Sequence, residues 1–148
     1  MVLPPDLAER AKTALSLTGQ FAPLVLQAAL AEFIREGFFF RYLNRMRRLY
    51  ARRRAAFMRL LGAELGDWLD PIDGRTGIQI AAPFRAPLDD REAVARAARE
   101  DIHPAPLSLY FVGAPALSGL LLGYAGLTEP AMERAMPRLR RVLEGLRR

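Results

Sequence analysis

Apolar residues recur at helical spacing over the middle of this chain. Within residues 39–65, apolar residues that are three and four positions apart share one side of a helix, and they are Leu43, Met46, Tyr50, Phe57, Leu60 and Leu61. The opposite stripe carries Arg41, Arg45, Arg48 and Arg52, at positions i, i+4, i+7 and i+11. The pattern predicts a long amphipathic helix over residues 39–65, with a packed face and a basic face.

Two shorter helices are expected before it. Asp6 is a suitable N-cap for a helix that runs to about Leu17 and stops near Gly19. Residues 23–35 form the second, with apolar side chains on nearly every side, so we expect burial on more than one face. Gly37 then supplies the conformation that commonly ends a helix.

The spacing changes to a strand pattern after Gly66. Residues 77–82 alternate or are apolar and predict a strand, and Trp68 and Leu69 predict a short partner strand. The Pro, Asp and Gly residues of segment 70–75 predict the turn between them. This part of the chain therefore predicts a β-hairpin.

The remaining segments predict a helix, an extended segment, a strand and a closing helix. Residues 89–100 form the first of these, capped by Asp89, with Val94, Ala97 and Ala98 facing inward. The prolines of residues 103–112 predict an extended segment, and residues 119–127 predict a buried strand. In the helix of residues 128–146, Pro137 predicts a kink or a delayed start. Its expected inner face is Met132, Met136 or Ala135, Leu139, Val142, Leu143 and Leu146.

This element order predicts an α+β fold, with long N-terminal helices before a small, mostly antiparallel sheet that carries helices on one face. The 148 residues correspond to one domain and contain no cysteine, which excludes disulfides, thiolate catalysis and cysteine-ligated metals. His103 alone cannot build a histidine-rich metal site, and no nucleophile elbow or phosphate-binding glycine loop accompanies it. The residue patterns therefore identify no catalytic, cofactor-binding or metal-binding residue.

Charge raises a different function class. The chain has a formal net charge of +6, and residues 38–54 hold seven arginines and no acidic residue. Such a helix can bind nucleic acid or an anionic surface, and its affinity would fall steeply with salt. Its aromatic residues are expected on the packed face, however, and no helix-turn-helix motif accompanies them. We therefore favour a solvated helix face, and a stand-alone basic module remains the alternative.

The longest apolar run, residues 21–34, is about 14 residues long and contains Gln27 and Glu32, which is too short for a membrane span. We expect no membrane association. The first ten residues lack the basic and then apolar pattern of a signal peptide. The sequence therefore predicts a cytoplasmic protein.

Four segments resemble the MocR-type branch of the GntR regulators. Residues 27–57, "QAALAEFIREGFFFRYLNRMRRLYARRRAAF", are similar to a signature of that branch. Residues 106–111, "PLSLYF", and residues 119–127, "GLLLGYAGL", look like two further motifs of the family in the right order. The opening "VLPPDL" is similar to the segment just after the cofactor lysine of the family. The resemblance covers nearly the whole chain.

The resemblance implies the C-terminal part of a fold-type-I aminotransferase-like domain, which binds pyridoxal 5′-phosphate in the parent family. It divides the chain into interdomain helices, residues 1–36, and a small domain, residues 37–148. The Schiff-base lysine, the aspartate that pairs with the pyridine nitrogen and the phosphate-cup glycines of the family would precede the matched segment. Lys12 lies on the wrong side of "PPDL" for the Schiff-base role. The resemblance therefore implies no covalent binding of the cofactor by this chain alone.

Other family positions have also changed. The arginine that holds the substrate carboxylate in catalytic relatives aligns with Leu121. A strand histidine appears as Gln79, and a helix histidine as Tyr42. Ser108 and Tyr110 are then the remaining weak candidates for substrate contact. No core catalytic residue of the family falls on this chain.

These points lead to an expected function. We expect a C-terminal fragment of a MocR-type regulator that is inactive alone. The alternative is a complete aminotransferase that forms only when the chain pairs with a separate large domain. Expected partners are that large domain or an intact paralogue. The helices of residues 6–35 would expose apolar surface without such a partner, so self-association or aggregation is expected. Nucleic-acid contact by the arginine helix is not expected.

Overall fold

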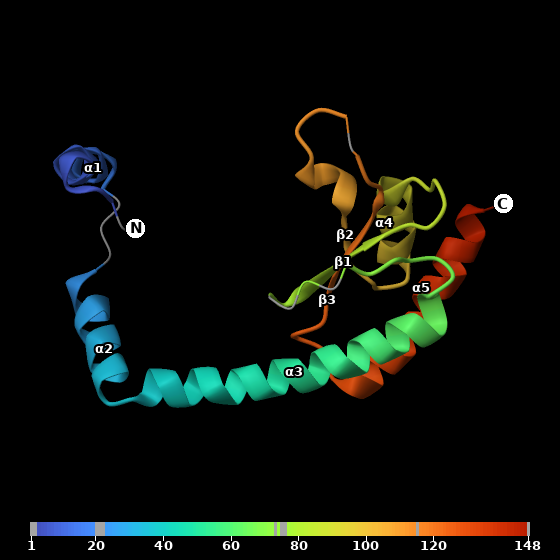
Figure 1. Ribbon diagram of the computed structural model, residues 1–148, viewed down its shortest axis with the longest axis horizontal. Helices are drawn as coiled ribbons and strands as arrows, with labels where there is room; N and C mark the ends of the chain where they lie inside the picture. The colour runs from blue at the N-terminus through green and yellow to red at the C-terminus, as the bar shows by residue number, and fades with distance from the viewer. Residues whose placement is uncertain (1–2, 20–22, 73, 75–76, 115, 148) are drawn as a thin grey trace. The chain divides into compact units, whose positions relative to one another are not determined.

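The computed structural model describes residues 3–19, 23–72, 74, 77–114 and 116–147 (Figure 1). The chain forms two compact units, Met1–Arg45 and Met46–Arg148. The long helix α3, Phe38–Leu65, begins in the first unit and ends in the second, and its bounds confirm the helix predicted over residues 39–65. The predicted division of the chain after residue 36 stays a prediction.

The first unit holds helices α1, Pro5–Thr18, and α2, Leu24–Arg35. Both predicted stops are confirmed, because Gly19 and Gly37 adopt left-handed conformations with φ of 64° and 74°. The predicted cap of α1 is wrong, since Asp6 lies inside the first turn and Pro4 is the N-cap residue. Proline at the first helical position has a φ already suited to the helix, so α1 starts at Pro5.

Helix α2 presents apolar side chains to solvent within this unit. None of its residues is buried, although Leu24, Val25, Leu26, Leu30, Phe33 and Ile34 are large and apolar. The burial predicted for more than one face of α2 is therefore wrong for this chain by itself, because no described residue of the unit covers the helix. The ring of Phe33 does stack on Phe38 at the start of α3, with centroids 5.9 Å apart.

The second unit contains a three-stranded sheet. Its strands are β1, Gln79–Pro83, β2, Ala105–Pro106, and β3, Gly119–Gly123. They lie in the order β1-β3-β2, and both pairings are antiparallel. The predicted α+β class with a small antiparallel sheet is confirmed.

One face of this sheet forms the core with three helices. Ile80 and Ala82 of β1 lie opposite Leu122 and Leu120 of β3, and all four are buried. Against them pack the second half of α3, helix α4, Asp90–Arg99, and helix α5, Glu129–Leu146. The largest fully buried side chains are Leu61, Leu65, Leu69, Ile80, Leu120, Met132 and Leu143.

The predicted inner faces of the last two helices are largely correct. Asp89 caps α4 by accepting from two backbone N–H groups, as predicted, but Ala93 rather than Ala98 is the buried alanine beside Ala97. Of the two alternatives predicted for the inner face of α5, Met136 is buried and Ala135 is half-buried. Pro137 lies inside α5 without delaying its start at Glu129.

Two predicted extended segments differ in the structure. Leu69 makes only an isolated antiparallel bridge to Phe84, so the hairpin partner is shorter than a strand. Residues 73 and 75 of the predicted turn lie outside the described residues. The extended segment is confirmed only through β2, because a 3₁₀ helix, η1, follows at Leu107–Tyr110. Proline forbids an α-helix interior but permits this shorter turn.

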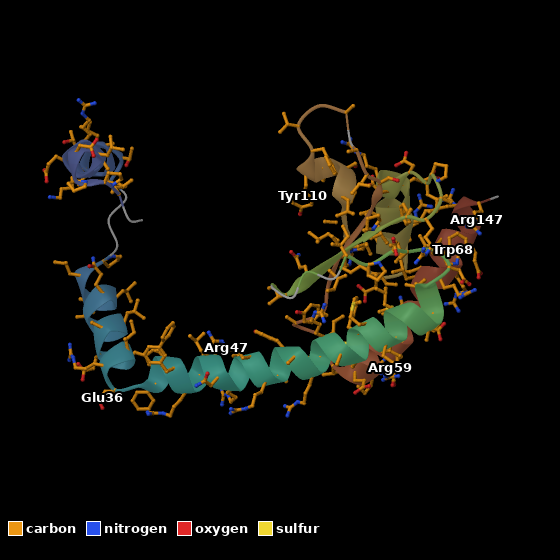
Figure 2. All side chains as sticks on the ribbon, viewed as in Figure 1. Glu36, Arg47, Arg59, Trp68, Tyr110 and Arg147 are labelled. Atoms are coloured by element: carbon orange, nitrogen blue, oxygen red, sulfur yellow. The ribbon has the colours of Figure 1, made fainter. Side chains whose placement is uncertain are left out.

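Arginines join the second half of α3 to the C-terminal part of the chain. The Arg53 guanidinium donates to the Ala125 carbonyl, and Arg140 Nη1 of α5 donates to the Glu64 carbonyl at 2.6 Å. Arg59 pairs with Glu129 at the start of α5 (Figure 2). The ring of Trp68, which follows α3, lies under the Arg147 guanidinium at 4.1 Å. The end of α3 is therefore fixed to α5 by polar contacts as well as by the core.

Candidate functional site

The face of the sheet away from the core carries the candidate site. It contains a hollow of about 360 Å³, lined by Ile72, Gly74, Gly77, Ile78, Gln79, Ala81 and Leu121. Strand alternation explains the lining, because Ala81 and Leu121 lie opposite each other while Ile80 and Leu122 point into the core. The described lining includes no charged side chain, so it offers an apolar wall with one amide.

The structure brings together the two positions that the resemblance assigned to this strand pair. Leu121 and Gln79 both line the hollow, on neighbouring antiparallel strands. An arginine at position 121 would present a guanidinium here, whereas leucine presents only methyl groups. The described residues of this hollow therefore cannot hold a substrate carboxylate by an ion pair.

Ser108, a candidate for substrate contact, is bonded to a buried carboxylate. Its backbone N–H donates to Asp90 Oδ2 at 2.8 Å, and its hydroxyl donates to Asp90 Oδ1 at 2.7 Å. The Gly119 N–H also donates to Asp90 Oδ2, at 3.2 Å. Asp90 is only 3% exposed, so this group of bonds joins α4, η1 and β3 in the interior. The Ser108 hydroxyl is therefore engaged by Asp90, which was not identified from the sequence.

Tyr110 lies in a different environment from Ser108. It stands at the end of η1 and is 65% exposed (Figure 2). A hollow of about 430 Å³ beside η1 is lined in part by Ser108 and Leu109, and Tyr110 is not among its lining residues. The two candidates therefore do not converge on one site in the described part of the chain.

The four residues of the predicted basic face, Arg41, Arg45, Arg48 and Arg52, are all exposed. The Arg41 guanidinium lies over the Phe38 ring at 4.5 Å, and that of Arg45 over the Tyr42 ring at 5.7 Å. Phe38 and Tyr42 are themselves exposed, so the placement of these two aromatics on a packed face is wrong. The buried part of α3 begins only at Phe57, which explains the difference.

The described residues do not fit pyridoxal phosphate as a covalently bound group. Lys12 of α1 has a side chain that is 72% exposed, and it pairs with Glu9 on the preceding turn at 2.6 Å. A lysine that forms Schiff bases is normally desolvated or placed beside another cation, which lowers its affinity for protons. Lys12 has neither feature, so no reaction step is assigned to this chain.

Metal and membrane sites have no counterpart in the described residues. No group of three or more His, Asp or Glu side chains gathers there in a way that could hold a metal ion. Among the same residues, no helix combines the length and apolar character that crossing a bilayer requires.

Comparison with known proteins gives relatives over almost the whole chain. No family model matches it. It is 43% identical over 141 residues to the probable rhizopine catabolism regulatory protein MocR of Rhizobium meliloti. It is 29% identical over 140 residues to the uncharacterized HTH-type transcriptional regulator YhdI of Bacillus subtilis. Each match covers 95% of this chain but only 28% and 30% of the relative, so the chain spans less than a third of these proteins.

Solved structures with the same fold are aminotransferases. The α-aminoadipate aminotransferase LysN of Thermus thermophilus superposes on 98% of the chain with a TM-score of 0.84 and 25% identity. The chain is a MocR-type, aminotransferase-like segment. The kynurenine aminotransferase of Pyrococcus horikoshii, at 15% identity, supports the fold alone, with a TM-score of 0.86 over 95% of the segment. The segment covers 37% and 35% of these two enzymes.

The comparisons confirm the resemblance that the sequence motifs indicated. The MocR-type segment corresponds to the C-terminal part of the aminotransferase-like domain, in the GntR group of regulators. They leave the roles of Ser108, Tyr110 and the basic face as predictions.

Proposed function

We propose that this MocR-type segment is a small domain that completes an aminotransferase-like domain with a large-domain portion that the described residues do not contain. In this role it is not catalytic alone and does not bind pyridoxal phosphate covalently. Residues 1–36 then serve as interdomain helices and residues 37–148 as the small domain. The same division was expected from the resemblance.

One observation carries the proposal. Helix α2 is rich in large apolar residues, and none of them is buried within its own unit. Monomeric proteins rarely expose contiguous apolar patches larger than about a few hundred Å². A large-domain portion of a relative more than three times as long supplies a surface that can cover α2.

The composition of the sheet hollow supports a partial site. Leu121 and Gln79 present an apolar surface with one amide and no charge. A substrate or effector carboxylate must then be held by groups outside this hollow. The aminotransferase relative LysN was solved with N-(5′-phosphopyridoxyl)-L-leucine, a pyridoxal derivative of an apolar amino acid. An apolar side chain of an effector suits the wall around Leu121 better than a charged one.

Complementation tests this function. The purified chain is mixed with pyridoxal phosphate, alone and together with Rhizobium meliloti MocR from which the matching region has been deleted. We expect an internal-aldimine absorption band only in the mixture of the two proteins. The deleted MocR without this chain is the control.

Two results would overturn the proposal. One is a band from this chain alone that disappears on borohydride reduction and maps to Lys12. The other is a failure of the two proteins to associate while the intact MocR still gives the band. Either result would show that the chain does not act by completing a large domain.

A further inference from the structure

A second cavity lies on the core side of the sheet, with a volume of about 450 Å³. Its wall includes Phe57 of α3, Leu122 of β3 and Met136 of α5, and its polar residues are Gln79, Asp101 and His103. Leu122 lines this cavity while its neighbour Leu121 lines the hollow on the other face, and the two linings share only Ile78 and Gln79. The volume falls in the range of small-molecule pockets, and the wall is mostly apolar, as such pockets usually are.

Asp101 is an unusual residue for its place in the fold. It has φ of 55°, and it is the only described residue other than glycine with a positive φ. It follows the C-cap residue Glu100 of α4, and its N–H donates to the Ala98 carbonyl at 3.1 Å. This position usually takes glycine and sometimes asparagine. A carboxylate there also faces the negative end of the helix dipole.

Glycine is the residue most favoured at position 101 and the helix dipole disfavours a carboxylate there, although aspartate adopts a positive φ more readily than most residues. Sequences depart from local preferences most often where function requires a particular group. Asp101 is among the residues that line the cavity, and its side chain is 90% exposed, so the carboxylate is open to a ligand from the solvent side. The presence of aspartate at position 101 is therefore explained if its carboxylate binds a ligand.

The surroundings of Asp101 define the charge of that ligand. Among the described residues that line the cavity, none is lysine or arginine. The ion pair described for Asp101 is with His103, whose Nε2 lies 3.5 Å from Oδ1, and both side chains are exposed. Arg138 of α5 donates to the Glu100 carbonyl and pairs with the Glu100 carboxylate instead. The carboxylate of Asp101 thus keeps capacity to accept from a cationic donor.

We propose that this cavity binds a small organic amine, with the apolar body between Phe57, Leu122 and Met136 and the ammonium group at the Asp101 carboxylate. The lining lacks the cations that an organic anion would need. This site uses no residue of the sheet hollow apart from Ile78 and Gln79, which line both. It requires neither pyridoxal phosphate nor a large domain, so its test is independent of the proposed function.

The test uses three probes of similar shape: phenethylamine, 2-phenylethanol and phenylacetate. Binding to the 148-residue chain is followed by isothermal titration calorimetry at low salt. We expect phenethylamine to bind most tightly and phenylacetate least tightly. In Asp101→Asn, phenethylamine should bind about 1.5- to fivefold more weakly, the range of a solvent-exposed ion pair, while the alcohol is unaffected. Asparagine tolerates the backbone conformation, so this variant keeps the fold.

Two further variants complete the experiment. Asp67→Asn removes another exposed carboxylate, outside the cavity lining, and should leave phenethylamine binding unchanged. Ala135→Phe fills the cavity from α5 and should abolish binding of the amine and the alcohol. If Ala135→Phe unfolds, Ala135→Leu is used in its place, because leucine adds less volume.

Several outcomes would overturn the proposal. Phenylacetate could bind as tightly as phenethylamine, or Asp101→Asn could weaken the alcohol as much as the amine. Retained amine binding in a folded Ala135 variant would place the ligand elsewhere. Absence of binding by all three probes would remove the site altogether.

Discussion

Replacement of Asp90 by alanine should destabilise the second unit much more than the same change at its neighbour Asp89. The two aspartates are adjacent in sequence and both belong to the start of α4. Asp89 is an exposed N-cap that accepts from the N–H groups of Arg91 and Glu92. Asp90 is buried and accepts from Ser108 and Gly119. The pair therefore separates helix capping from the interior contacts.

The expected magnitude follows from the donors that lose their acceptor. Asp90→Ala leaves the N–H groups of Ser108 and Gly119 without a partner, while the Ser108 hydroxyl can rotate to another acceptor. An unsatisfied buried donor costs about 1–3 kcal/mol, so the two together cost about 2–6 kcal/mol. Loss of the exposed cap in Asp89→Ala costs about 1 kcal/mol. Asp90→Asn keeps one carbonyl acceptor, so the decrease in its free energy of unfolding should lie between these two values.

The free energy of unfolding can be measured by urea titration followed by tryptophan fluorescence. Trp68 is the only tryptophan, it is 6% exposed, and it belongs to the core of the second unit. Its emission therefore reports unfolding of the unit that holds Asp90. Equal slopes with urea among the variants are needed to compare them as two-state transitions.

A loss in Asp90→Ala no larger than that in Asp89→Ala would refute the reasoning. It would mean that water or a rearranged η1 satisfies the Ser108 and Gly119 donors at little cost. A Ser108→Ala variant provides a further check, because it removes only the hydroxyl bond and should cost about 1 kcal/mol.

Four other predictions concern backbone and surface. Gly119→Ala should destabilise the second unit by about 1–3 kcal/mol in the same titration, since a Cβ would meet the Ala82 carbonyl oxygen at 2.5 Å, and Gly123→Ala, with open space, is its control. Asp101→Gly should raise the free energy of unfolding by about 0.5–1 kcal/mol, and an unchanged or lower value would contradict the strain at this residue. Combined Leu26→Gln and Leu30→Gln changes in α2 should reduce self-association in light scattering, unless the unmodified chain is already a dilution-stable monomer. Any binding of a DNA oligonucleotide to the basic face should be lost at physiological salt, and tight binding that survives there would favour the stand-alone basic module.

The sequence predicted those elements whose signals are local and long. Helix α3 was predicted to within one residue at its start because its apolar residues repeat over about five turns. The cap of α4 was also correct, since Asp89 acts on N–H groups two and three residues ahead. The partners in such contacts are close together in the sequence. They do not depend on how distant segments meet.

The Asp90 contacts could not be predicted in the same way. Its partners lie 18 and 29 residues along the chain, so no local pattern records them. The one available signal was the double aspartate at the start of α4, of which only one is needed as a cap. The same bonds hold Ser108 at the second position of η1, where the prolines had predicted only extended chain.

Only the resemblance drew attention to positions 79 and 121 of the candidate site. Alternation along the strand predicts that Leu121 and Leu122 face opposite sides, as they do. That position 121 matters at all came from the family motif, because a leucine in an apolar strand has no distinguishing feature of its own. The cavity beside Asp101 had no sequence signal, since its lining comes from α3, β1, β3, α5 and the segment after α4.

The exposed apolar side chains of α2 favour a partner that covers them. Full burial of one large apolar side chain contributes about 1.5–3 kcal/mol, so six partly exposed ones represent on the order of 5–10 kcal/mol. That amount is comparable to the whole free energy of unfolding of a domain and is large enough to offset part of the cost of association. A large domain and a second copy of this chain would compete for the same surface. If the large-domain portion is the natural partner, adding it should dissolve the self-associated form, whereas a true homodimer would persist.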